Sequence, residues 1–197
     1  MPSHTASATS STPPAFQHAL SLPIPEPTLR HSFRLVCDLE AVRSLGEGLH
    51  GDGGQFNWIN FTGGHFEGTF GSGEVVAGGQ DSQHLLPPTH PSAPLAAQLS
   101  TRYLLKHSSG TFIQVQTRGW RTGSLDVLQR LSDAARGGKD KDGRDVVVPG
   151  PDEYKFRLCI EMETDAKRDL AWLNQAMFVG SGIRSGRQVI YDAYLIE

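Results

Sequence analysis

FTGGHFEGTFGSGEVVAGGQD, residues 61–81, places seven glycines between short runs in which apolar and polar side chains alternate. Glycine is favoured where φ must be positive or where a second backbone passes closely. Within strands it marks bulges and sharp bends. The stretch therefore predicts two strands joined by tight turns in a strongly curved sheet, and such a sheet tends to close into a barrel.

The rest of the chain supplies further strands of the same kind. Residues 154–163 alternate strictly between apolar and polar side chains, as a strand with one buried face does. Two apolar runs flank Ser108-Ser109-Gly110, where the glycine suits a tight hairpin. With the glycine-rich stretch, the expected strands number about eight and cover residues 29–40, 58–61, 99–107, 111–118, 154–163, 172–179 and 188–196. This content predicts an all-β protein, a single antiparallel β-barrel.

One short helix and several loops interrupt the strands. Ser124 is a suitable N-cap for a helix whose apolar residues recur at helical spacing, and Gly137 follows its end. Four prolines in residues 85–94 predict an extended linker without ladder pairing. The glycine-rich loop 44–54, which contains His50, is expected to be a mobile loop at the barrel mouth.

Residues 1–27 differ in composition from everything that follows. They are rich in Ser, Thr, Ala and Pro, and the prolines remove backbone donors and hold the chain extended. We expect a disordered N-terminal arm at 1–27 and a barrel domain at 28–197. The apolar cluster Phe16–Ile24 either stays unpacked or docks on the barrel or on a neighbouring subunit.

Charge and composition narrow the classes of partner. The 197 residues carry 18 Lys and Arg against 21 Asp and Glu, a formal charge of −3, and the basic residues are scattered rather than gathered in a patch. No apolar run reaches the roughly 18–20 residues of a membrane helix, and residues 1–12 lack the pattern of a signal peptide. We therefore expect no nucleic-acid partner, no membrane anchor and a cytoplasmic location. Cys37 and Cys159 lack a CxxC partner and are expected to be buried free thiols.

The glycine-rich stretch and several later segments together resemble the domain-of-unknown-function 3237 family. The matching segments are Tyr103–Gly119, Tyr154–Arg157, Trp172–Asn174, Gly180–Gly182 and Tyr191–Tyr194, so the resemblance covers roughly residues 29–197. It implies a small antiparallel β-barrel that often self-associates, in a family without an established general activity. The family often has tryptophan after the acidic residue that corresponds to Asp81, whereas this chain has Ser82.

Two arginines are the leading candidates for ligand recognition. Arg118 shares one strand face with Gln114 and Gln116, and Arg157 lies on a strand of alternating character. We expect Arg118 and Arg157 to reach the barrel interior, where a guanidinium can clamp a carboxylate, phenolate or carbonyl oxygen. The alternative for Arg118 is an ion pair with Asp81, Glu67 or Glu161 that fixes strand register.

Acid–base chemistry has two candidate locations. Asp81 is either a general base whose pKa burial raises or a turn carboxylate that caps nearby amides. His65 and Glu67 lie two residues apart and therefore on one strand face, as an acid–base pair or as an exposed edge pair.

Side chains with an apolar body and a hydrogen-bonding end suit a pocket for a flat, oxygenated molecule. Tyr103 is a candidate catalytic residue, and Tyr154, Trp172, Asn174 and His50 are candidate ligand contacts, although buried Tyr and Trp also complete ordinary cores. Histidine spacing matches no metal motif, and the chain has no P-loop, no GxGxxG unit after a strand and no GxSxG elbow. We expect neither a metal nor a cofactor.

These features favour a cofactor-independent tailoring enzyme, a cyclase, isomerase or proton-transfer catalyst that acts on a hydrophobic oxygenated metabolite. The first alternative is a non-catalytic carrier or sensor that uses the same pocket. The second is a structural or assembly protein with a fully packed barrel. Homo-oligomerisation is expected to be possible in each case.

Overall fold

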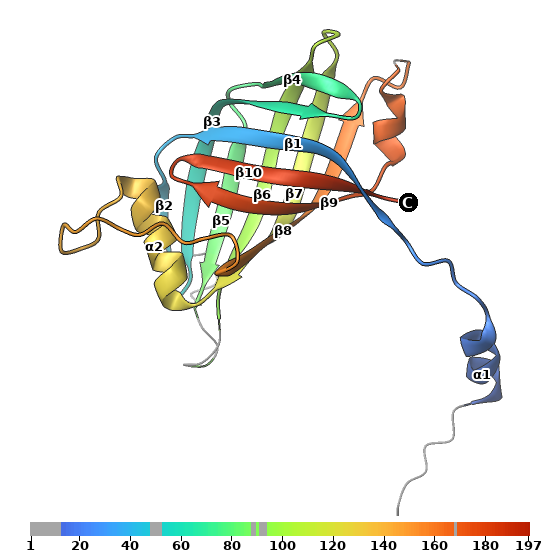
Figure 1. Ribbon diagram of the computed structural model, residues 1–197, viewed down its shortest axis with the longest axis horizontal. Helices are drawn as coiled ribbons and strands as arrows, with labels where there is room; N and C mark the ends of the chain where they lie inside the picture. The colour runs from blue at the N-terminus through green and yellow to red at the C-terminus, as the bar shows by residue number, and fades with distance from the viewer. Residues whose placement is uncertain (1–12, 48–52, 88–89, 91–93, 168) are drawn as a thin grey trace, which may run out of the picture.

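The computed structural model describes residues 13–47, 53–87, 90, 94–167 and 169–197. Within these residues, ten strands form one antiparallel sheet that closes because β1 pairs with both β10 and β3 (Figure 1). The strands are β1 Leu29–Leu39, β2 Arg43–Glu47, β3 Gln55–Gly68, β4 Gly71–Val75, β5 Gln80–Leu86, β6 Leu95–His107, β7 Phe112–Gly123, β8 Tyr154–Thr164, β9 Phe178–Ser185 and β10 Gln188–Ile196.

The ten strands occupy eight positions around the barrel. β4 and β5 both lie between β3 and β6, so together they fill one position that is broken at residues 76–79. β1 and β2 pair in turn with the opposite edge of β3 and fill another position. The expected all-β antiparallel barrel of about eight strands is therefore confirmed.

Glycine permits the close pairing of β1 with β3. A Cβ atom on Gly64, which has a φ of 141°, would lie 2.0 Å from the carbonyl oxygen of Val36 on β1. Only a residue without a side chain fits there, which accounts for one glycine of the stretch that predicts the curved sheet.

Three helical segments accompany the sheet in the described residues: α1 Pro14–Ser21, α2 Leu125–Arg136 and the 3-10 turn η1 Ala171–Gln175. α2 begins as predicted, because the Ser124 hydroxyl accepts a hydrogen bond from the Val127 N–H at 3.3 Å. None of the described helices has the length and apolarity needed to cross a bilayer.

α1 and η1 depart from the sequence-based expectation. α1 lies inside the arm for which no regular element was expected, with proline in its first turn, and Figure 1 shows it apart from the barrel. η1 replaces the first part of the strand expected at 172–179, because the Asn174 side chain accepts from the Thr164 N–H at 2.7 Å and donates to the Thr164 carbonyl at 3.1 Å. These two bonds fold the chain back on the end of β8, and β9 begins only at Phe178.

Alternation along each strand decides which side chains fill the interior. Tyr154, Phe156, Leu158 and Ile160 of β8 are buried while their neighbours are exposed. Cys37 is buried on β1, but Cys159 falls on the outer face of β8 and is exposed, so the expectation of two buried thiols was wrong for Cys159.

The two ends of the barrel are filled differently. At one end Phe33 packs edge-on against Phe66, Phe70, Phe178 and Tyr191, with ring centroids 5.5–6.4 Å apart. In the middle, a void of about 20 Å³ remains among apolar and hydroxyl side chains and the carboxyl group of Asp81. The other end is polar and is covered by α2.

Candidate functional site

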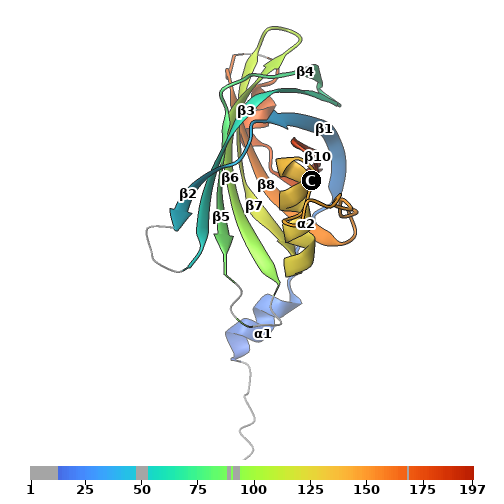
Figure 2. The ribbon, with the colours of Figure 1, turned by 90° about the vertical axis from the view of Figure 1, so that its left-hand side faces the viewer.

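A cavity of about 230 Å³ lies between the barrel and α2. Figure 2 looks toward this end of the barrel and shows α2 lying across its opening. The helix supplies a roof in which Leu125, Leu128 and Leu131 are accompanied by the polar Gln129 and Ser132. Leu85 and Leu95 extend the apolar wall. The polar residues of the floor are Gln55, Asn57, Gln83, Arg121 and Arg184.

Four strands contribute these floor residues. Asn57 of β3 lies opposite Gln83 of β5 in the ladder, and both side chains are buried. Arg121 comes from β7 and Arg184 from β9. The backbone N–H of Arg184 donates to the Tyr154 hydroxyl at 2.9 Å, which ties the floor to β8. The site thus depends on pairings between distant parts of the chain.

Asp81 lies inside the barrel, two residues before Gln83 on the same face of β5. Its Oδ2 accepts a hydrogen bond from Gln83 Nε2 at 2.6 Å, while its Oδ1 has no hydrogen-bond partner among the described residues. Burial raises the pKa of the Asp81 carboxyl above its ordinary value, and the Gln83 bond and the charges of Arg121 and Arg184 partly oppose this shift. The position within β5 excludes the turn role considered for Asp81.

The two floor arginines are unusual because they are almost fully buried. Arg121 is 8% exposed, and its Nε has no hydrogen-bond partner in the described part of the chain. Burial lowers the pKa of Arg121, with Asp81 acting in the opposite direction. Burial and, second, the charge of Arg121 lower the pKa of Arg184 to about 10. Arg184 Nε donates to the Gly186 carbonyl at 3.2 Å, which fixes the side chain.

The structure brings three of the predicted catalytic or ligand-binding residues into the interior: Asp81, Tyr103 and Tyr154. Tyr154 supports the floor through Arg184, as described above. Tyr103 lies farther along the barrel, and its hydroxyl is 2.5 Å from that of Tyr191.

Arg118 and Arg157 point outward, so the expectation that they reach the interior was wrong. On β7 the inward phase belongs to Ile113, Val115 and Thr117, and on β8 to residues such as Phe156, which leaves both arginines on the exposed face. An ion pair between outward Arg118 and interior Asp81 is also excluded. Arg118 and Arg157 line an open hollow of about 550 Å³ on the outer surface.

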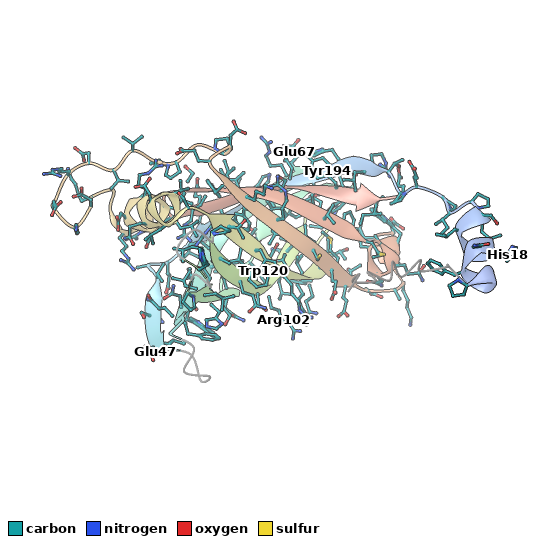
Figure 3. The ribbon with its side chains drawn as sticks, turned by 90° about the horizontal axis from the view of Figure 1, so that it is seen from below. His18, Glu47, Glu67, Arg102, Trp120 and Tyr194 are labelled. Carbon is teal, nitrogen blue, oxygen red and sulfur yellow. The ribbon has the colours of Figure 1, made fainter. Side chains whose placement is uncertain are left out.

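The remaining predicted residues on β3 and β7 also lie outside. Gln114 donates to Glu163 at 3.1 Å, and Gln116 accepts from Arg102 at 2.8 Å. His65 and Glu67 are exposed on β3, which pairs with strands on both sides there and is not an edge. Figure 3 shows Glu67 and Arg102 on different sides of the barrel surface. The structure therefore does not bring these residues to the cavity.

Three predicted contacts lie elsewhere. Trp172 of η1 is 41% exposed and packs on Phe70 and Phe178 at the aromatic end of the barrel. Asn174 is engaged by the backbone of Thr164. His50 lies outside the described residues, and in the described part no group of three His, Cys, Asp or Glu side chains could hold a metal ion.

Sequence reasoning missed Arg121, Arg184, Gln83 and Asn57. A signal for Arg121 exists, because it lies four residues after Thr117 and so continues the inward phase of β7. The same rule links Arg184 to Phe178, six residues earlier on β9.

Comparisons with known proteins agree with this fold. The UPF0311 protein of Rhodopseudomonas palustris strain TIE-1 is 28% identical over 172 residues, which cover 86% of this chain and 98% of the relative. A β-barrel-like protein of Acinetobacter baumannii AYE is similar in structure, with a TM-score of 0.66, 34% identity and coverage of 89% of this chain and 99% of that one. A structure described as an enzyme from Penicillium herquei has a TM-score of 0.55 at 16% identity, covering 90% of this chain and 98% of the other.

The family model described as "Protein of unknown function (DUF3237)" matches residues 27–196. This range contains all ten strands, α2 and every described residue of the cavity. The chain therefore belongs to the DUF3237 family.

Proposed function

We propose that the protein binds a small hydrophobic, oxygenated metabolite under α2 and rearranges it by cyclisation, isomerisation or proton transfer without a bound cofactor. The observation that carries this proposal is the contrast within one cavity between a leucine-rich roof and a floor of buried amides and guanidiniums. Ligand sites commonly combine apolar walls with a few placed polar groups that fix orientation.

The floor supplies what such a reaction needs. Arg121 and Arg184 are fixed donors that can stabilise negative charge developing on a substrate oxygen, and they act strongly because the site is largely withdrawn from water. Holding the substrate in a reactive conformation can contribute up to about 7–11 kcal/mol in favourable intramolecular reactions. Neither contribution needs a metal or a nucleotide.

Asp81 is the proposed proton acceptor and donor, although its carboxyl lies one layer beneath the cavity lining and the substrate would have to reach past Gln83 to contact it. A raised pKa brings its carboxyl closer to the range in which general acid–base catalysis is efficient, and the bond from Gln83 links it to the cavity floor. Replacing Asp81 by Asn should lower kcat while leaving ligand binding much less affected. An unchanged kcat would remove Asp81 from the mechanism.

The enzyme described from Penicillium herquei adds support by analogy, because it indicates that a related barrel can host catalysis. A carrier or sensor would use the same cavity for binding alone.

The test combines native mass spectrometry with product analysis. Wild-type protein is incubated with a metabolite extract of the cells that make it, alongside Ser132→Phe, which fills the cavity from α2, and Ser132→Ala, which leaves it open. We expect one metabolite to disappear and another to appear with wild type and Ser132→Ala, but not with Ser132→Phe. Retained ligand in an unchanged extract would indicate a carrier. If the protein neither retains a ligand nor converts a metabolite, a small-molecule role is refuted. The native mass also gives the number of subunits.

A further inference from the structure

The charges around the cavity are unbalanced. Arg121, Arg184 and Arg136 line it, whereas none of the described lining residues carries a carboxylate. Arg136 is exposed at the rim, so water screens it. Asp81, which is buried one layer beneath the floor, offsets one of the two buried guanidiniums. One buried positive charge is left over among the described groups.

A buried guanidinium without a counter-charge in the protein is stabilised by an anionic ligand. Transferring an unpaired charge from water into a protein interior costs several kcal/mol, even after the surroundings relax. Arginine does not readily lose its proton, and its planar donors match two oxygens of a carboxylate or one phenolate oxygen. Arg121 Nε, without a partner in the described structure, lies at the cavity. A neutral occupant could accept a hydrogen bond from this N–H group but would leave the excess positive charge unbalanced.

The roof limits what can accompany the charge. Leu125, Leu128 and Leu131 offer no hydrogen-bonding side chain to a ligand, so the part of the molecule beneath these leucines is apolar. Gln129 and Ser132 of α2 also line the cavity and can bind a polar substituent. The volume of about 230 Å³ is below the roughly 300–1,000 Å³ that is usual for drug-sized ligands. A dianion such as phosphate would exceed the single excess charge and would have no apolar body to bury.

We propose that the occupant is a small organic monoanion whose ionised oxygen group, a carboxylate or a phenolate, lies between Arg121 and Arg184 while its apolar body contacts α2. This inference rests on the proposed function for the location of the site, and it adds the chemical class of the substrate. It makes Arg121 and Arg184 the residues that select for charge.

Matched neutral and charged probes test the proposal on the wild-type protein. Phenylacetate and phenylacetamide have nearly the same shape and differ in charge, so we expect phenylacetate to bind about tenfold more tightly or better in calorimetric titration. 4-Nitrophenol provides the phenolate arm, because its absorbance reports ionisation. Binding should increase the phenolate absorbance at fixed pH, with the phenol proton passing to the buffer.

Variants then locate the charge effect. Arg121→Gln and Arg184→Gln should each weaken phenylacetate binding by about tenfold while changing phenylacetamide binding much less. Arg118→Gln, which removes an outward guanidinium from the same strand as Arg121, is the matched control and should bind like wild type. Circular dichroism checks that each variant is folded, and the wild-type comparison does not depend on the variants.

The outcomes separate this inference from the proposed function. Equal affinity for phenylacetate and phenylacetamide together with no phenolate signal, or an equal loss of binding in Arg118→Gln, would overturn the anion proposal. Turnover of a neutral metabolite in the extract would also overturn it while leaving the enzyme proposal standing. Selective anion binding without any turnover would support the anion proposal and refute the enzyme.

Discussion

Replacing either Tyr103 or Tyr191 alone by Phe should destabilise the protein more than replacing both tyrosines together. The two hydroxyl oxygens are 2.5 Å apart, and each residue is only 3% exposed. Tyr103→Phe or Tyr191→Phe leaves the other hydroxyl buried and without its partner. The double variant leaves none, because both polar groups are replaced by apolar rings of the same shape.

The structure sets the size of the effect. Stranding a buried polar group costs about 1–3 kcal/mol. The void of about 20 Å³ beside the pair has room for one water molecule, which needs roughly 10–15 Å³. We therefore expect about 1–2 kcal/mol for each single variant and less than about 1 kcal/mol for the double variant, a coupling energy of about 1–4 kcal/mol.

Urea unfolding followed by tryptophan fluorescence and circular dichroism measures these free energies. Each kcal/mol should also lower Tm by about 2–4 °C in a protein of this size. If the losses in unfolding free energy of the two single variants sum to that of the double variant within about 0.5 kcal/mol, the contact between the hydroxyls does not contribute to stability as described.

Three further predictions concern backbone packing, helix capping and charge. Gly64→Ala should destabilise by about 3 kcal/mol or more in urea unfolding, since its Cβ would lie 2.0 Å from the Val36 oxygen. Ser124→Ala should cost about 1 kcal/mol through loss of the α2 N-cap, measured in the same way. Hydrogen bonds from Arg34 lower the pKa of the folded-state Asp192 carboxyl below its ordinary value of 3.8. The ionised carboxylate therefore stabilises the fold at pH values above 3.8, and this stabilisation is lost as the pH falls through the folded-state pKa. Asp192→Asn should flatten this dependence of Tm on acid pH in thermal melts.

Matched variants check the causes. At Gly150 an added Cβ would meet only Glu153 Oε1, at 3.8 Å, so Gly150→Ala should be far milder than the change at Gly64. Ser124→Thr should keep most of the cap energy. Arg34→Gln should flatten the acid dependence as Asp192→Asn does, and an unchanged slope in both would contradict the assigned pair.

The barrel was predictable because its signals are local. Glycines at bends, the Ser108–Gly110 turn, the strict alternation of 154–163 and the Ser124 cap each depend on a few adjacent residues. η1 was not predictable in the same way, because Asn174 ends the strand expected there by bonding to Thr164, ten residues earlier.

The site was harder to predict because it combines side chains from four strands. Arg118 was chosen for its polar neighbours, although those neighbours mark the solvent face of β7, while Arg121 continues the apolar phase. Arg121 lies near Arg184 because of the order of strands around the barrel, which no local sequence pattern predicts. Asp81 was found because the glycine-rich stretch ends there, but its interior position follows from pairing with β3 and β6.

The roof of the cavity belongs to one connection, residues 124–153, which joins β7 to β8 and contains α2. Arg130 of α2 holds this segment together through its bonds to Asp126 and Glu153, at 2.9 and 2.7 Å. Because strands make the floor and a single connection makes the roof, exchanging that connection would alter which molecular shapes are admitted without disturbing barrel closure. Grafting this connection between homologous barrels would transfer preference for shape while the arginine floor kept its preference for charge.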